Sequence, residues 1–219
     1  MSKHFFRALV TDTRNRLHHG KRAPKYGERL YIDVRQVRFY LPSVAVSLQF
    51  GVRLRQASGR VVSTWPEAQL RPVEVHPKVQ YCLRHWLEGA SWEASGAYDY
   101  MMRRIRDSAS GRFDGCASLD DVRARYAALD KLFMEFQRGS GFKSMSELDA
   151  HAYREVGGVV VHIGPGGEPV FGGAGAHRFA MGRALGLVIP VQIGLVHETA
   201  VDLLNPYRSG TGRGAQSWA

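Results

Sequence analysis

FGGAGAHRFAMGRALGLVIP, residues 171–190, is the stretch that decides the fold. Its first glycines let the backbone turn sharply and approach a ligand closely. A short helix is expected to begin near His177 and to end at Gly186, since glycine is the usual left-handed cap of a helix. The N–H groups of a first helical turn point toward an anion, and Arg178 adds a two-pronged cationic donor. The stretch therefore predicts a phosphate-binding loop joined directly to a helix.

Strands are expected on both sides of this loop. Residues 159–163 (VVVHI) have the composition of a buried strand, 164–167 (GPGG) that of a turn, and 168–171 that of a hairpin partner. Residues 189–196 form a further expected strand. The loop is thus predicted to lie at the edge of a small sheet.

Helical periodicity dominates the middle of the chain. The clearest case is 119–136, where apolar residues recur at steps of three and four and Ser118 precedes them as a cap. Shorter helices are expected at 79–86 and 98–105. Ser144 and Glu147 have capping-box spacing, which predicts a brief helix through about Arg154.

The first third shows mixed patterns. Residues 29–40 alternate as an extended segment does, and 44–54 with 61–63 suggest a hairpin. Residues 4–17 form an amphipathic helix, which either docks on the body of the protein or binds a membrane surface or partner. The residues expected on its apolar side are Phe5, Phe6, Leu9, Val10 and Leu17.

The positive charge is confined to one part of the chain. The 219 residues carry a formal net charge of +10. Residues 1–60 contain 13 Lys/Arg and 3 Asp/Glu, a difference of +10, while the remaining residues contain 17 of each sign. Such a segment either attracts nucleic acid or an anionic membrane surface, or is only a solvated basic face.

Composition narrows the class of protein. The hydrophobic content of 44% is ordinary for a globular chain, and no apolar run approaches the roughly 20 residues that span a bilayer. The N-terminus lacks a secretory signal pattern, and the two cysteines have neither metal-ligand nor redox spacing. These features favour a cytoplasmic protein without disulfides.

The order of elements between about Asp120 and Val196 resembles the ParB/sulfiredoxin superfamily. The resemblance rests on the turn 166–168, the motif 171–178, the helix end 185–187 and residues 189–191 (IPV). It implies an α+β fold, a small mixed sheet with packed helices. The implied parts are a basic, partly strand-forming segment (1–60), a helical insertion or linker (61–117), the superfamily core (118–200) and a flexible tail (201–219).

The resemblance also implies a ligand. In this superfamily the corresponding loop binds the phosphates of ATP or CTP, which here would come with Mg²⁺. The positions implied to contact phosphate are Gly172, Gly173, Gly175, His177 and Arg178. The alternative is a tight turn in which the His-Arg pair only caps the helix.

Two departures from the superfamily narrow the expected activity. Ala176 stands where sulfiredoxins carry their reactive cysteine, which excludes thiol-dependent sulfur repair. Only 23 residues follow Val196, which leaves no room for the helix-turn-helix of partition proteins.

Catalysis would require a base or a metal site near the loop. Glu168 and Glu155 are the candidate carboxylates, and His177, which could donate to a phosphoryl oxygen, is the third candidate catalytic residue. His162 and His197 lie in or beside strands that could be neighbours, which would permit a metal or acid–base pair. No dense carboxylate cluster supports a two-metal nuclease. A phosphotransferase or NTPase and a non-catalytic nucleotide-sensing or nucleic-acid-binding module both stay open.

Overall fold

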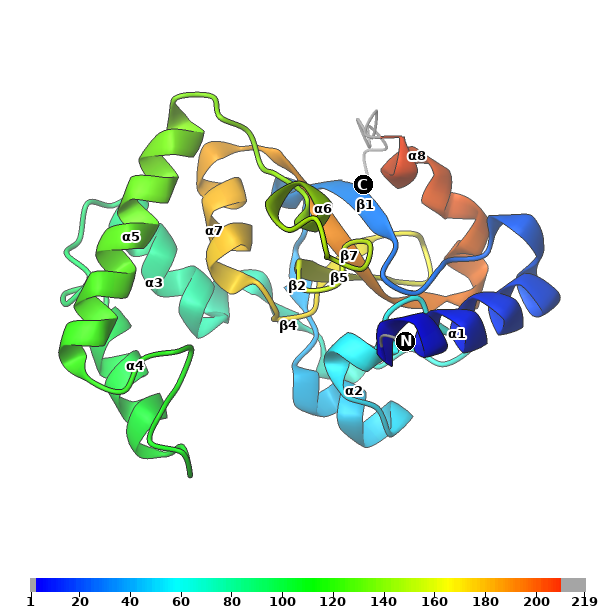
Figure 1. The fold of residues 1–219 in the computed structure, drawn as a ribbon, viewed down its shortest axis with the longest axis horizontal. Helices are drawn as coiled ribbons and strands as arrows, with labels where there is room; N and C mark the ends of the chain where they lie inside the picture. Colours follow the sequence, from blue (N-terminus) through cyan, green and yellow to red (C-terminus); the bar gives the residue numbers. More distant parts are fainter. Residues whose placement is uncertain (1–2, 210–219) are drawn as a thin grey trace. The chain divides into compact units, whose positions relative to one another are not determined.

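The computed structural model describes residues 3–209, which divide into two compact units (Figure 1). The sheet unit combines Met1–Val73, Phe142–Gly175 and Gly186–Ala219. The helical unit combines Glu74–Gly141 with Ala176–Leu185. Each unit is described by itself.

The sheet unit is built on a mixed sheet, as the α+β prediction requires. The described residues form seven strands in the order β1-β7-β5-β6-β2-β4, and β3 pairs with β7 outside this path. β5 runs parallel to β7 and antiparallel to β6, while β1 is antiparallel to β7. The bounds are β1 (Arg29–Asp33), β2 (Phe39–Tyr40), β3 (Val61–Val62), β4 (Arg71–Pro72), β5 (Val159–Ile163), β6 (Pro169–Phe171) and β7 (Val188–His197).

The core of this unit lies along β5 and β7. All five residues of β5 are buried, as are Ile189–Val196 of β7, because both faces of these central strands are covered. The predicted strands at 159–163 and 189–196 and the turn between β5 and β6 are confirmed, with β6 one residue shorter than expected.

Helices and 3-10 segments connect the strands of the sheet unit. They are α1 (Lys3–His19), α2 (Ser43–Phe50), α6 (Met145–Leu148) and α8 (Asn205–Arg208), with 3-10 segments η1 (Gly20–Arg22), η2 (Val34–Gln36), η3 (Leu54–Ala57), η4 (Glu67–Gln69), η5 (Val73–Val75) and η6 (Glu198–Leu204). The helix at 4–17 is thereby confirmed. Of these segments, η5 crosses the boundary between the units after Val73.

Three local predictions were wrong. The expected hairpin over 44–54 is α2 followed by η3, because Ala45 and Val46 turn toward a buried cluster with Leu41 while Gly51 caps the helix in a left-handed conformation. The capping box of Ser144 and Glu147 is present, but α6 ends at Leu148. Residues 201–208 are helical rather than a flexible tail, and residues 210–219 of that tail lie outside the described residues.

The helical unit packs four helices around apolar stripes. They are α3 (Pro77–Trp86), α4 (Ala97–Arg106), α5 (Leu119–Gln137) and α7 (Ala176–Leu185), with α7 alongside both α3 and α5 (Figure 1). α5 follows the predicted periodicity: Val122, Tyr126 and Phe133 are buried, and Ser118 forms a capping box with Asp121.

The unit boundaries differ from the expected domain limits. Residues 61–73 belong to the sheet unit through β3 and β4, whereas α5 and α7, expected in a core spanning 118–200, pack with the preceding helices. α7 joins this unit because its buried face is completed by α3 and α5, which lie far away in the sequence.

Asp130 connects α5 to α3 and to the loop after it. Its carboxylate accepts hydrogen bonds from His85 Nε2 (3.0 Å), Trp86 Nε1 (3.0 Å) and Trp92 Nε1 (2.9 Å). We expect Asp130→Ala to lower the free energy of unfolding by about 2 kcal/mol, since two indole N–H groups lose a charged acceptor. Urea unfolding followed by circular dichroism measures this loss.

Asp120 provides the matched control on the same helix. Its side chain is 90% exposed and pairs only with Arg123. Asp120→Ala should change stability by less than about 0.5 kcal/mol. Equal changes in the free energy of unfolding for the two substitutions would show that the hydrogen bonds of Asp130 do not stabilise the protein.

Candidate functional site

The glycine-rich loop lies between β6 and α7 and is attached to the central strand β5. The N–H of Gly172 donates to the carbonyl of Val160 (2.8 Å), and the carbonyl of Ala174 accepts from the Val160 N–H (3.2 Å). Both backbone groups of one β5 residue thus hold the loop on the sheet unit. Hydrogen bonds to the sheet therefore fix the position of the loop.

Glycine is required in this loop by close packing on β5. A Cβ at Gly175 would lie 2.8 Å from the Cα of Val159, and the residue has a φ of +75°. A Cβ at Gly172 would lie 2.9 Å from Val160 Cγ1. Gly173 also has a positive φ, +83°. The glycines therefore serve the packing of the loop, whatever else they do.

The loop presents backbone donors. Within residues 3–209, no hydrogen bond engages the N–H groups of Gly173, Ala174 or Gly175. α7 begins at the next residue, Ala176. Successive N–H groups of this kind are the usual elements of an anion-binding backbone. The unit boundary falls after Gly175, so His177 and Arg178 belong to the helical unit.

His177 is a buried member of the helical unit. Its Nε2 lies 3.1 Å from the hydroxyl of Tyr81, which accepts a hydrogen bond from the Tyr126 hydroxyl (2.6 Å). Burial, with the nearby positive charges of Lys78 and Arg125, lowers the pKa of His177 to about 3, and burial raises the pKa values of both tyrosines. The imidazole is neutral at pH 7. The sequence suggested that His177 donates to a phosphoryl oxygen. In the structure its Nε2 contacts the Tyr81 hydroxyl instead.

The two candidate carboxylates stabilise local structure. Glu155 is fully buried, accepts from the Met145 N–H at 3.1 and 3.2 Å, and forms an ion pair with Arg29 at 3.3 Å. Glu168 accepts from the Gly166 N–H at 2.8 Å within the β5–β6 turn. Neither position matches that of a general base poised beside the loop.

Arg55, which the sequence analysis missed, is a cation of the sheet unit. Its Nη1 donates to the carbonyl of Gly158 (3.2 Å) and to the side-chain oxygen of Gln192 (3.4 Å). Burial lowers the pKa of this guanidinium, and no carboxylate among the described residues pairs with it. Gly158 directly precedes Val159, against which Gly175 packs. A half-buried cation without a counter-ion therefore lies beside the loop's attachment to β5.

Two further buried donors lie on the sheet. His162 Nδ1 accepts from the Leu195 N–H (2.8 Å), which places the proton on Nε2, and that atom has no partner among the described residues. The Nε2 atom lies 3.0 Å from the position a Cβ of Gly172 would take. The side-chain nitrogen of Gln192 is also buried without a partner. No linear motif marks these residues, because both are embedded in apolar strands.

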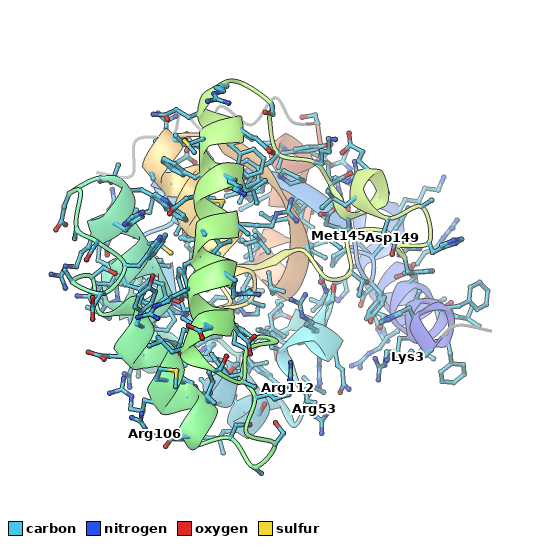
Figure 2. The ribbon with its side chains drawn as sticks, turned by 60° about the vertical axis from the view of Figure 1, so that its left-hand side comes forward. Lys3, Arg53, Arg106, Arg112, Met145 and Asp149 are labelled. Atoms are coloured by element: carbon cyan, nitrogen blue, oxygen red, sulfur yellow. The ribbon has the colours of Figure 1, made fainter. Side chains whose placement is uncertain are left out.

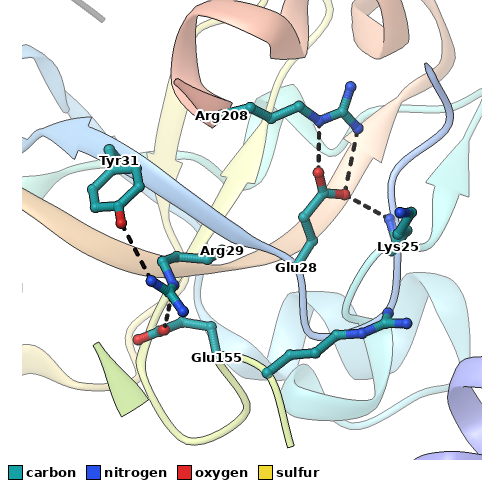
Figure 3. A pocket seen from close by; sticks show the side chains of 7 residues that line it. Lys25, Glu28, Arg29, Tyr31, Glu155 and Arg208 are labelled. Atoms are coloured by element: carbon teal, nitrogen blue, oxygen red, sulfur yellow. Dashed lines mark hydrogen bonds and ion pairs between the residues drawn. The ribbon is translucent and has the colours of Figure 1, made fainter. Parts of the chain in front are cut away.

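A pocket of about 380 Å³ lies elsewhere in the sheet unit (Figure 3). Its charged walls are held by ion pairs of Arg208 with Glu28 (2.6 Å) and Arg29 with Glu155. No loop residue lines it. The other basic residues at its wall are Lys25 and Arg154.

The possible pair of His162 and His197 is not formed. His162 bonds to the backbone of β7, whereas His197 Nδ1 lies 2.8 Å from the Thr199 hydroxyl and its Nε2 lies 3.3 Å from the Ser63 carbonyl oxygen. In the part of the chain that the structure describes, no three His, Cys, Asp or Glu side chains are grouped as metal ligands would be.

Comparison with protein-family models, with curated proteins and with solved structures finds no match. The ParB/sulfiredoxin resemblance thus stays a prediction from the order of elements and motifs between about Asp120 and Val196. Over residues 3–209, no helix has both the length and the apolar character needed to cross a bilayer.

Proposed function

We propose that this chain binds a nucleotide, ATP or CTP with Mg²⁺, through the glycine-rich loop. The observation that carries the proposal is the row of N–H groups at Gly173, Ala174 and Gly175, held on β5 and followed directly by the start of α7. The resemblance of this loop to the ParB/sulfiredoxin motif supports the same ligand class.

The charge of Arg55 supports an anionic ligand. Burial removes water from around the Arg55 guanidinium, and no carboxylate of the described residues compensates for this loss. The two neutral acceptors, the Gly158 carbonyl and the Gln192 side-chain oxygen, replace the lost solvation only in part. A phosphate group near the β5 attachment of the loop would restore that balance. The superfamily motif implies Arg178, which follows the loop in the sequence, as a further phosphate contact.

Binding without phosphoryl transfer is the better supported form of this function. Glu155 is committed to Arg29 and to the Met145 N–H, and Glu168 to the Gly166 N–H. His177 is neutral and bonded to Tyr81. A nucleotide-sensing module requires none of these groups to move a proton.

Calorimetric titration with ATP, CTP, GTP and UTP, each with and without Mg²⁺, tests the proposal. We expect saturable heat for at least one nucleotide, and an affinity at least about tenfold lower in Arg178→Ala, since one charge-assisted contact is lost. Absence of heat for all four nucleotides would overturn the proposal.

Arg55→Gln gives a second prediction, which concerns both the free energy of unfolding and the affinity for nucleotide. The substitution removes a cation that pairs with no carboxylate of residues 3–209, so the free energy of unfolding should stay unchanged or rise. The affinity for nucleotide should fall by about tenfold, because the bound phosphate loses that cation. Urea unfolding and calorimetry on the same samples measure both effects.

Arg53→Gln is the matched control, since Arg53 is exposed in the same segment. It should change neither quantity. A destabilised Arg55→Gln protein that binds nucleotide normally would assign Arg55 a purely structural role.

A further inference from the structure

Helix α1 is attached to the sheet unit through its polar side. Asn15 Nδ2 donates to the carbonyls of Pro24 and Gly59, both at 2.7 Å. Asp12 accepts from the Tyr26 N–H (2.7 Å) and forms an ion pair with Arg154 (2.8 Å). The only buried residues of the helix are Ala8 and Asn15. Side-chain to backbone contacts, not an apolar stripe, thus fix the orientation of α1.

The apolar side of α1 faces away from the sheet unit. An amphipathic helix of a globular protein normally buries this side. Here its large apolar residues recur at the spacing of one helical face, opposite Ala8 and Asn15. Their exposed fractions are Phe5 47%, Phe6 62%, Leu9 55%, Val10 53% and Leu17 79%. Figure 2 labels Lys3 at the start of this helix.

The charges around this face are positive. Lys3, Arg14, Arg16 and Lys21 are exposed on α1 and on the segment that follows it. Asp12, the one acidic residue of α1, is turned inward to Arg154 and to the backbone of Tyr26. The surface therefore combines an apolar patch in the first half of α1, made by Phe5, Phe6, Leu9 and Val10, with basic edges, and α1 has no exposed carboxylate.

We propose that α1 docks the protein on an anionic lipid surface, lying in the interface with Phe5, Phe6, Leu9 and Val10 inserted. At 17 residues the helix is about 25 Å long, and its apolar face would lie at the boundary between headgroups and acyl chains. The basic edges would then meet anionic headgroups. This docking is independent of the nucleotide site.

The same features disfavour other occupants. Nucleic acid would engage the basic side chains through phosphates but would leave the exposed phenylalanines in water. A second copy packed face to face would bring the basic edges of two helices together without an acidic partner. A lipid surface accommodates both the apolar face and the charges.

Co-sedimentation of the full chain with vesicles tests this proposal. We expect binding to equimolar phosphatidylglycerol and phosphatidylcholine, little binding to phosphatidylcholine alone, and weaker binding as salt is added. The double variant Phe6→Ser/Leu9→Ser should lower the partition coefficient by about tenfold or more. Arg14→Glu/Arg16→Glu should abolish the preference for the anionic vesicles.

Val44→Ser/Leu48→Ser is the matched control, because these residues of α2 are 61% and 79% exposed and lie outside α1. It should bind vesicles as the unaltered chain does. Three outcomes would overturn the proposal: no binding by the unaltered chain, equal binding by Phe6→Ser/Leu9→Ser, or a dimer in light scattering that this variant dissociates. Salt-sensitive DNA binding without vesicle binding would assign the surface to nucleic acid.

Discussion

Gly194→Ala is expected to lower the free energy of unfolding by about 4 kcal/mol. A Cβ at Gly194 would lie 2.3 Å from His162 Nδ1 and 2.8 Å from its Cε1, so the buried imidazole would have to move. Moving it breaks the hydrogen bond in which the Leu195 N–H donates to Nδ1, and both groups lie in a fully buried part of the sheet. Urea unfolding monitored by circular dichroism measures the effect.

Gly186→Ala is the control for glycine replacement in general. Gly186 has a φ of +65°, and its added Cβ would meet only the side chain of Arg35, at 3.5 Å. We expect a loss of about 1 kcal/mol, from backbone strain alone. Similar losses for the two variants would contradict a steric conflict at His162.

A double-mutant cycle identifies His162 as the obstacle. His162→Ala alone should destabilise the protein, because the Leu195 N–H loses its acceptor and a cavity remains. On the Gly194→Ala background the same substitution should cost about 2 kcal/mol less, since it also removes the clash. Additive losses would place the strain elsewhere.

The elements governed by local patterns could be predicted from the sequence. The β5–β6 hairpin follows from a valine run and a glycine-rich turn, and α5 follows from its apolar stripe and the Ser118 cap. The 44–54 segment could not be predicted in this way. Its alternation reflects a short helix with both buried and exposed apolar residues, so the period alone was ambiguous.

Features that depend on residues far apart in the chain could not be predicted from the sequence. α1 has an ordinary amphipathic pattern, but the contact of Asn15 with Gly59, 44 residues away, turns its apolar side outward. Arg55 has neutral acceptors in place of a carboxylate because the fold puts the Gly158 carbonyl and the Gln192 side-chain oxygen next to it. The same limit applies to His177, whose partner Tyr81 lies 96 residues earlier.

Mild acid is expected to destabilise the protein through its buried histidines. Burial lowers the pKa values of His162 and His177 to about 3, and burial together with the charge of Lys78 lowers that of His76 to about 4. The unfolded chain keeps these groups near 6.5. As the pH falls below about 6.5, the unfolded state therefore takes up protons that the folded state does not.

The sign follows from this difference in bound protons. The neutral histidines contribute fully to the free energy of unfolding above their unfolded-state pKa of about 6.5. This contribution is lost as the pH falls toward their folded-state pKa values. Below pH 6.5 the loss of stability from each fully shifted histidine should steepen toward about 1.4 kcal/mol per pH unit, as the unfolded chain becomes fully protonated at that position. The range from about pH 6.5 to 5.5 isolates the histidines, since carboxylates with ordinary pKa values near 4 stay almost fully ionised there. The helical unit contains two of the three groups, so we expect it to lose stability more steeply than the sheet unit.

Urea unfolding at several pH values across that range, with His177→Gln beside the unaltered chain, separates this effect from general acid sensitivity. The variant should be less stable at pH 7, because the Tyr81 hydroxyl loses its imidazole partner. Its stability should nevertheless depend less steeply on pH, by the equivalent of one proton. His18→Gln, at an exposed position of α1, should keep the original slope. An unchanged slope in His177→Gln would mean that this imidazole is protonated as readily in the folded chain as in the unfolded one. Its burial against Tyr81 and Tyr126 and the nearby charge of Lys78 both act against protonation in the folded chain.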